Sequence, residues 1–180
     1  MLLEDEVIIL RPMQPGYYPL FFSWITDPNV MGDQQPFHSG DFAAFVRGIE
    51  QAAANPPGSF TFLIMQKEGN IPVGFVGHFR AHFMVEDIEI GYVIIPQHRK
   101  NGYGTRAVRL LVAYLFRTNN LERIQALPGI ENSASRRILV RCGFREEGRL
   151  RHYFFINGSY RDHFSYSITR EDWLKSQADS

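Results

Sequence analysis

Apolar and polar residues alternate along several stretches of the chain, and this two-residue period predicts strands with one face in a core. Strands are predicted over residues 7–13, 60–66, 72–83, 88–95 and 123–127, and over two further runs between residues 151 and 168. The turn Glu68-Gly69-Asn70 predicts that the second and third strands pair as a hairpin. Asn157-Gly158, between the last two runs, is a strong signal for a two-residue hairpin turn.

Other stretches repeat apolar residues every three or four positions, as one face of a helix does. Four helices are predicted, over residues 17–28, 42–53, 103–118 and 133–142. Asp41 suits the N-cap of the second helix, and Asn132 or Ser133 suits the N-cap of the fourth. Pro28 is expected to end the first helix and Gly143 the fourth, because proline breaks helices and glycine favours the left-handed turn after them.

The predicted elements follow one another in the order β-α-α-β-β-β-α-β-α-β-β. This order predicts a mixed α/β layered fold, with a central sheet of about seven strands and about four helices. Antiparallel strands flank one central strand-helix-strand crossover. Because 180 residues with 44% hydrophobic content are enough for one core, we expect residues 1–180 to form a single domain.

The start of the sequence and its apolar runs predict the cellular compartment. The sequence starts with MLLEDEV, which is acidic where a signal peptide would be basic, and no apolar run approaches the roughly 18 residues of a membrane span. We therefore expect a cytoplasmic protein without a membrane partner. The single cysteine, Cys142, excludes an internal disulfide and is expected to pack at a helix end.

Charge is unevenly distributed although the net charge is zero. Residues 1–97 hold 4 basic and 11 acidic residues, a net charge of −7, whereas residues 98–151 hold 12 basic and 4 acidic residues, a net charge of +8. A basic half that attracts a polyanion and an acidic half that receives a cation would give this pattern, and so would solvated helix faces. No aromatic stacking motif accompanies the arginines, so we expect no nucleic-acid partner.

Six histidines raise the question of a metal site. His78 and His82 are four residues apart, a spacing that suits zinc on a helix. They fall in a predicted strand, where four residues span about 13 Å, so they cannot share one ion. We expect no metal.

The stretch QHRKNGYGTRAV, residues 97–108, places two glycines where a strand gives way to a helix. The first turn of a helix has free N–H groups and a positive dipole end, so this turn suits a phosphate group. A nucleotide-binding P-loop needs G-x-x-x-x-G-K-[ST], which does not occur in the chain. A Rossmann turn is compatible with Ala107 at its third glycine position, but the acidic residue that would bind the ribose is missing.

Two motifs fit a third kind of site. Residues 99–104 (RKNGYG) match R/Q-x-x-G-x-G/A, the coenzyme A pyrophosphate loop of the GNAT superfamily of N-acetyltransferases. Residues 132–135 (NSAS) and 142–144 (CGF) follow at the spacing of the family's next motif, N-x-x-[SA] ending in G-F. Residues 27–31 (DPNVM) and 89–92 (EIGY) look like the branch that acetylates the N-termini of ribosomal proteins.

The resemblance, which extends from about residue 7 to residue 173, implies the GNAT fold, with two parallel strands that splay apart around acetyl-CoA. Gly102 and Gly104 lack a Cβ atom, so backbone amides there can approach the pyrophosphate oxygens. Asn132 would contact the pantetheine arm or serve only as a helix cap. The cofactor-binding residues are therefore expected to be Tyr92, Val93, Ile94, Ile95, Arg99, Lys100, Asn101, Gly102, Tyr103, Gly104, Thr105 and Asn132.

Catalysis in this family is a direct attack of the substrate amine on the acetyl thioester, so the amine must first lose a proton. Glu89 lies where many relatives place a general base, although a solvated or ion-paired carboxylate would fit the same position. Many members carry a tyrosine as general acid seven residues after the motif's asparagine, where this chain has Leu139. Ser135 is therefore the candidate for contact with the leaving sulfur, and a serine that bonds only to its helix backbone is the alternative.

The acceptor amine is expected in a groove between residues 24–41, residues 86–89 and the final hairpin. Its candidate substrate-binding residues are Trp24, Asp33, Glu86 and Asp87. A protein or peptide N-terminus is the favoured acceptor. A polyamine or another small amine is the alternative, because residues 154–161 (FFINGSYR) look like the matching stretch of spermidine acetyltransferases. The missing tyrosine leaves a non-catalytic acyl-CoA-binding module open, and the sequence does not decide between a monomer and a homodimer.

Overall fold

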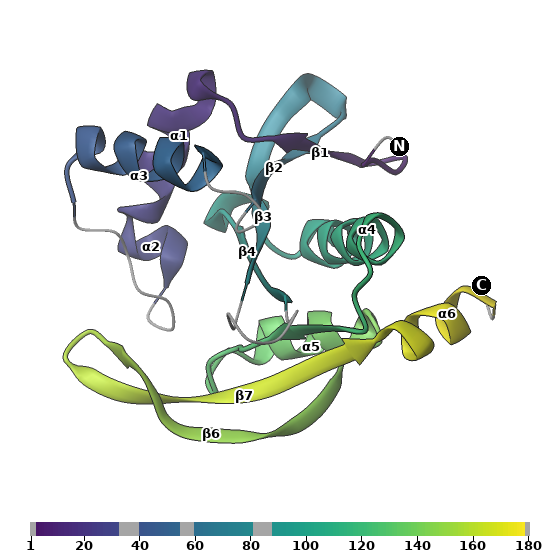
Figure 1. The fold of residues 1–180 in the computed structure, drawn as a ribbon. Coiled ribbons are helices and arrows are strands. Elements are labelled where there is room, and N and C mark those ends of the chain that lie inside the picture. Colours follow the sequence, from purple (N-terminus) through teal and green to yellow (C-terminus); the bar gives the residue numbers. More distant parts are fainter. Residues whose placement is uncertain (1–2, 33–39, 55–59, 81–87, 179–180) are drawn as a thin grey trace.

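The computed structural model describes residues 3–32, 40–54, 60–80 and 88–178, and Figure 1 shows how their elements are arranged. Seven strands form one sheet in the order β1-β2-β3-β4-β5-β7-β6. The strands are β1 (Ile8–Pro12), β2 (Phe60–Gln66), β3 (Ile71–Arg80), β4 (Ile88–Ile94), β5 (Arg123–Ala126), β6 (Arg145–Ile156) and β7 (Ser159–Thr169). The α-helices are α1 (Tyr18–Ile25), α2 (Pro28–Met31), α3 (Phe42–Ala54), α4 (Tyr103–Thr118), α5 (Ser133–Arg141) and α6 (Arg170–Ala178).

In the described residues the strand predictions are confirmed, including both hairpins, and residues 81–83 of the third predicted strand lie outside the described residues. Strands β2 and β3 pair antiparallel, and so do β6 and β7. Asn157 and Gly158 both have positive φ angles, +51° and +80°, which is the backbone geometry of the tight turn that their sequence predicts. The predicted caps are also present, since the side chain of Asp41 accepts a hydrogen bond from the amide of Ala44 at 2.7 Å.

The described residues hold six α-helices where about four were predicted. One addition is the single-turn helix α2. Pro28 ends the first helix as expected, but it also starts α2, because proline suits the first helical position and Asp27 caps the new turn by accepting from Asn29 N at 2.8 Å. The other addition is the C-terminal helix α6.

Helices cover both faces of the sheet. In Figure 1, α1, α2 and α3 lie on one side of the β1–β4 part of the sheet and α4 lies on the other. The main core packs α4 and α5 against the sheet, with Leu111, Leu115 and Leu139 fully buried in it. A second cluster around Trp24 and Leu63 packs α1 and α2 on the opposite face. Within the described ranges, no helix is both long and apolar enough to cross a bilayer.

The parallel strands β4 and β5 form the fork of the sheet. They pair at only two positions, Ile88 with Ile124 and Glu89 with Gln125. Strand β4 then continues to Ile94, still paired with β3, while β5 ends at Ala126. The splayed parallel pair predicted from the family resemblance is therefore present, and the edge of β4 beyond Glu89 is open toward β5.

Candidate active site

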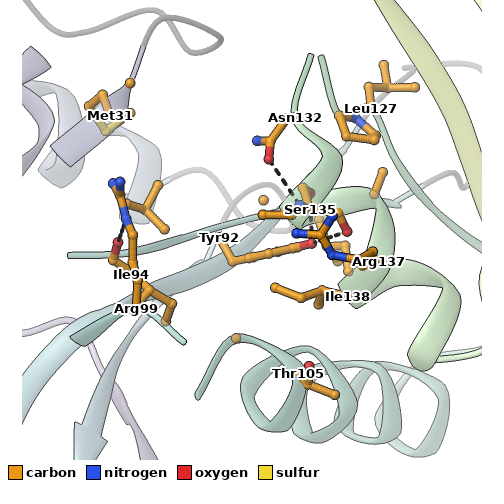
Figure 2. A pocket seen from close by; sticks show the side chains of 18 of the residues that line it. Met31, Tyr92, Ile94, Arg99, Thr105, Leu127, Asn132, Ser135, Arg137 and Ile138 are labelled. Atoms are coloured by element: carbon orange, nitrogen blue, oxygen red, sulfur yellow. Dashed lines mark hydrogen bonds between the residues drawn. The ribbon is translucent and has the colours of Figure 1, made fainter. Parts of the chain in front are cut away.

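A pocket of about 930 Å³ opens where β4 and β5 separate. It is lined by the loop before α4, the first turns of α4 and α5, strand β4, helix α2 and the β6–β7 hairpin. Figure 2 shows several of these side chains around the space, with Tyr92 and Ser135 joined in its middle. We call the part formed by residues 99–105 and the first turns of α4 and α5 the loop half. The part around Glu89, Phe79, Phe154 and His163 is called the fork half.

The loop half presents backbone amides. Gly102 is the N-cap of α4 with φ +80°, and no side chain caps this helix. The first amides of α4, from Tyr103 to Thr105, have no acceptor within their own helix, because a helix leaves its first N–H groups unpaired. A Cβ atom at Gly102 would meet nothing within 4 Å, so the space in front of these amides is open. Such a helix entrance binds anions, and phosphate groups in particular.

The side chain of Arg99 stabilises the fold through hydrogen bonds to backbone carbonyls. Its Nε donates to the carbonyl of Ile94 at 3.0 Å, and its Nη2 donates to the carbonyls of Asn29 and Val30 at 3.3 and 3.0 Å. The side chain thus ties the loop to the end of β4 and to α2, as Figure 2 shows for the contact with Ile94. Lys100, with φ +68°, is exposed beside it and lines the pocket. Binding of the pyrophosphate by either side chain stays a prediction.

Gly104 is required by packing. A Cβ atom there would lie 2.9 Å from Cδ1 of Ile138 on α5 and 3.7 Å from Cγ1 of Ile94 on β4. The glycine therefore lets α4 approach α5 and β4 closely at the entrance of the pocket. The sequence argument explained this glycine by close approach of the ligand. The structure adds a second reason, the close contact between α4 and α5.

Asn132 caps α5. Its side-chain oxygen accepts a hydrogen bond from the amide of Ser135 at 3.0 Å, so the cap expected as one alternative is present. The residue also lines the pocket. In the described part of the chain its side-chain nitrogen, Nδ2, has no hydrogen-bond acceptor. One side chain therefore holds the first turn of α5 and remains able to donate to a ligand.

Tyr92 and Ser135 form a hydrogen-bonded pair across the pocket. The phenol oxygen of Tyr92 lies 2.8 Å from Oγ of Ser135 and 3.1 Å from the carbonyl oxygen of the same residue. Burial raises the pKa of Tyr92 above its ordinary value, so the phenol stays neutral and acts as a hydrogen-bond partner. Leu139, at the position where many relatives carry a tyrosine, is fully buried in the main core.

The fork half contains one carboxylate with a shifted pKa. Glu89 stands at the last pair between β4 and β5, and Nε2 of Gln125 donates to its Oε2 at 3.4 Å. Burial raises the pKa of Glu89 from 4.5 to about 7, against the smaller opposing effect of the Gln125 hydrogen bond. A carboxylate that is half protonated near neutral pH is suited to accept and release protons.

The structure brings most of the predicted site residues together. In the described part of the chain, Glu89, Tyr92 to Ile94, Arg99, Lys100, Gly102 to Thr105, Asn132 and Ser135 all line one pocket. Trp24 of α1 does not join them, because it is 7% exposed and packs in the second hydrophobic cluster. Ile95 packs against the same cluster, and the Asn101 side chain donates to the His98 carbonyl at 3.3 Å. Asp33, Glu86 and Asp87 lie outside the described residues.

Other pocket residues were missed by the sequence argument. Met31 from α2, Phe79 from β3, Phe154 from β6 and His163 from β7 each contribute one side chain. The ring of Phe154 meets that of His163 edge to face at 4.8 Å between centroids. Met31, Phe154 and His163 fall in the segments that the sequence argument assigned to the acceptor groove, residues 24–41 and the final hairpin, but none was named as a site residue. Phe79 of β3 carried no signal.

Neither a metal nor the cysteine has an evident role in the described site. No group of three or more His, Cys, Asp or Glu side chains among the described residues could hold a metal ion. Cys142 lies beside α4, with its Sγ 3.6 Å from the carbonyl of Thr105. Burial raises the pKa of this thiol to about 11, so it is protonated at neutral pH.

Comparison with known proteins decides the family. The family model of the acetyltransferase (GNAT) domain matches residues 8–145. The chain belongs to the GNAT acetyltransferase family. Members of this family transfer acetyl groups from acetyl-CoA. In sequence the chain is 43% identical over 98 residues to the Uncharacterized N-acetyltransferase YoaA of Bacillus subtilis, a stretch that covers 54% of the chain and 55% of that relative. The match therefore spans about half of the relative's length.

Two solved structures show the same GNAT fold. Spermidine N-acetyltransferase from Vibrio cholerae, in complex with CoA and spermine, superimposes with a TM-score of 0.83 at 22% identity, over 94% of this chain and 99% of that one. Ribosomal-protein-S5-alanine acetyltransferase from Vibrio fischeri gives a TM-score of 0.80 at 23% identity, over 96% and 98% of the two chains. At this identity the likeness establishes the fold, and it does not choose between the two kinds of acceptor.

Proposed function

We propose that this GNAT protein transfers an acetyl group from acetyl-CoA to a primary amine, and that its acceptor is the N-terminal amine of a protein or peptide. The observation that carries the proposal is the half-buried Glu89 at the fork, in the same pocket as an uncapped, glycine-started helix entrance. The first feature suits a general base, and the second suits a diphosphate.

The loop half fits acetyl-CoA. The backbone amides at the start of α4 would hold the pyrophosphate, and the open edge of β4 from Tyr92 to Ile94 would pair with the amide groups of the pantetheine arm. Asn132 would donate its free amide N–H groups to the same arm. Acetyl-CoA supplies an acetyl group already activated as a thioester, so the protein has only to position the two reactants and manage protons.

Two groups would manage the protons and charge. Glu89, when ionised, accepts a proton from the acceptor's ammonium group and so generates the nucleophilic amine. Ser135 donates a hydrogen bond where negative charge develops on the leaving sulfur, and the positive end of α5 supports the same charge. The Tyr92 phenol holds the Ser135 hydroxyl in place, and if it donates to Oγ, the serine proton is free to point into the pocket.

The lower pKa of an α-amino group favours an N-terminal acceptor. An α-amino group has a reference pKa near 8, and a lysine-type or polyamine nitrogen has one of about 10.4. Because the pKa of Glu89 is about 7, proton transfer from an α-ammonium is uphill by about one pKa unit, and transfer from a polyamine by more than three. The first transfer is therefore faster by roughly two orders of magnitude if all else is equal.

A polyamine is the second candidate. It is supported by the fold shared with the Vibrio cholerae spermidine enzyme and by Phe154, which lines the pocket in the stretch that looks like spermidine acetyltransferases. A screen of peptides with free N-termini, the same peptides with blocked N-termini but free lysines, and spermidine distinguishes the candidates by the mass of the acetylated product.

The expected result of that screen is acetylation of free N-termini with a pH dependence that Glu89→Gln changes. Acetylation of spermidine alone would move the proposal to the second candidate. Tight CoA binding, measured by calorimetry, without transfer to any amine would instead show a non-catalytic binding module.

A further inference from the structure

Gln125 lies beside Glu89 at the fork of the sheet. The neighbours of these two residues along their strands, Ile90 on β4 and Ile124 on β5, point into the main core. Because side chains alternate along a strand, Glu89 and Gln125 both project from the opposite face, toward α1 and α2. Their strands are paired at this position, so the amide of Gln125 is held next to the carboxylate, with Nε2 at 3.4 Å from Oε2.

Arg123 fixes which end of the Gln125 amide faces the carboxylate. It stands two residues earlier on the same face of β5, and its Nη1 donates to Oε1 of Gln125 at 2.8 Å. A guanidinium has donors only, so it holds the carbonyl end of the amide. The NH₂ end is therefore directed at Glu89, and a flipped amide would place two donors together at Arg123.

Glu147 on β6 holds Arg123 in turn. Its Oε2 accepts from Nη2 of Arg123 at 2.6 Å and from the Ser165 hydroxyl at 3.1 Å, while its Oε1 accepts from the Ser167 hydroxyl at 2.7 Å. Burial by itself would raise the pKa of Glu147, but these donors outweigh burial and hold the pKa below its ordinary value. The anion therefore persists across the working pH range and anchors a chain of hydrogen bonds from β6 to β4.

We propose that Gln125 is a positioning residue for the general base, and that Arg123 and Glu147 hold it in the orientation that donates to Glu89. The inference rests on the proposed function, in which Glu89 takes the proton from the acceptor. A fixed donor on one carboxylate oxygen favours the ionised form and leaves the other oxygen for the substrate.

Several charged or histidine side chains line the pocket together with Glu89 in the described part of the chain: His163 from β7, His98, Arg99 and Lys100 from the loop, and Glu131, Arg137 and Arg141 from α5 and the residues before it. Arg123 and Glu147 are not in this lining and act on Glu89 through Gln125. Strand β3 places Phe79 opposite Glu89, and α2 contributes Met31 to the pocket, neither of which titrates. His78 of β3 pairs with Ile90 and so lies on the other face. The nearest donor whose removal can be tested cleanly is therefore Gln125.

The consequence is a defined shift in pH dependence. The Gln125 hydrogen bond lowers the pKa of Glu89, and burial raises it. Replacing Gln125 with methionine removes the donor at similar side-chain length, so the pKa of Glu89 rises further. The acid limb of the kcat/KM profile then moves to higher pH by about half to one unit, which at pH 6 is a loss of roughly three- to tenfold.

Two more variants test the order of the hydrogen bonds that run from Glu147 through Arg123 and Gln125 to Glu89. Gln125→Glu keeps an acceptor for Arg123 but replaces the donor with a second carboxylate, so its shift is larger than that of Gln125→Met. Arg123→Met frees the amide to flip and gives a smaller shift in the same direction. Arg145→Met is the matched control, because the Arg145 side chain pairs with Asp172 at 2.6 Å on the exposed end of β6, and in the described residues it makes no hydrogen bond or ion pair with Glu147, Arg123 or Gln125.

The experiment measures the titration of Glu89 directly, in protein labelled with carboxyl-¹³C glutamate and without any acceptor. The Glu89 signal is assigned as the one lost in Glu89→Gln, and circular dichroism establishes that each variant is folded. Midpoints that rise in the order Arg123→Met, Gln125→Met, Gln125→Glu, with Arg145→Met unchanged, support the inference.

An unchanged midpoint in folded Gln125→Met and Gln125→Glu overturns the inference even if the enzyme acetylates amines through Glu89. Conversely, a shifted midpoint in a protein that transfers acetyl to no amine leaves the hydrogen-bond chain intact and rejects the proposed function. The two failures are therefore distinguishable.

Discussion

In the loop half of the pocket, the side chains of Arg99 and Asn132 and the missing side chain of Gly104 serve the fold, and the groups left for a ligand are mainly backbone amides. In the fork half the reverse holds, because Glu89, Phe154 and His163 present side chains brought together from different strands. The loop half is therefore sensitive to changes of shape, whereas the fork half is sensitive to changes of polar chemistry. Each prediction below tests one side of this contrast.

The largest effect is expected in the fork half, from Glu89→Gln. The amide cannot accept the ammonium proton, so kcat/KM at pH 8 should fall about a thousandfold, within the range for loss of a general base. In the wild type Glu89 must be ionised to act, and burial raises its pKa to about 7. Activity should therefore fall about tenfold per pH unit below pH 7, and in the variant this limb should move to the pKa of the acceptor amine itself, which is near 8 for an α-amino group. The Kd of the variant for acetyl-CoA should stay within about twofold of the wild-type value. A variant with the wild-type pH profile would show that Glu89 is not the general base.

In the loop half, Gly104→Leu should weaken the binding of acetyl-CoA. The new Cβ would lie 2.9 Å from Cδ1 of Ile138, and the rest of the side chain would separate α4 from α5 or fill the entrance. Calorimetry should show a roughly hundredfold rise in the Kd for acetyl-CoA. Gly48→Leu on α3 is the control, since a Cβ at Gly48 meets nothing within 4 Å.

Two smaller substitutions test the contact between Gly104 and Ile138. Gly104→Ala should weaken cofactor binding only a few fold, because its Cβ meets the end of one flexible side chain. Adding Ile138→Val removes the Cδ1 atom and should restore binding. A folded Gly104→Leu protein that binds acetyl-CoA normally would refute the role of this glycine.

Ser135 and Tyr92 lie where the two halves meet. Ser135→Ala removes the donor to the leaving sulfur and should lower kcat about tenfold with little change in either KM. Tyr92→Phe removes only the partner of that hydroxyl, at 2.8 Å, and should lower kcat about threefold. The double variant should be no worse than Ser135→Ala, because the phenol acts through the serine. Additive losses would mean that Tyr92 acts independently.

The smallest effect is expected from Arg99→Met. Arg99 links the loop to carbonyls of α2, so its loss should raise the KM for acetyl-CoA and for the amine by about threefold each. Lys100→Met should raise only the KM for acetyl-CoA, and less so at high salt. An Arg99 variant that affects acetyl-CoA alone would show that the guanidinium serves the ligand and not the link.

The sequence predicted the loop half well because local rules govern it. The two glycines and the Asn132 cap act within a few residues of where they stand, so a motif can record them. The hairpin at Asn157-Gly158 followed from the same kind of local signal, whereas the sequence did not predict that β7 lies between β5 and β6 in the sheet. The alternation in residues 88–95 likewise placed β4 correctly.

The fork half could not be predicted in this way. Phe154 and His163 reach the pocket, and Gln125 reaches Glu89, through pairings between strands. No spacing along the chain records such contacts. Helix α6 was missed for a related reason. It has no apolar stripe, and it is held by Trp173 and by Arg170, whose guanidinium donates to three carbonyls at the end of α4 and just beyond it.

The state of Cys142 makes these measurements simpler. It is the only thiol in the chain, and with a pKa of about 11 only about one molecule in a thousand carries the thiolate at pH 8. A chromogenic disulfide reagent added to the reaction will therefore react with CoA as it is released and hardly with the enzyme. Turnover can be followed continuously in a cuvette, without labelled substrate and with almost no background from the catalyst.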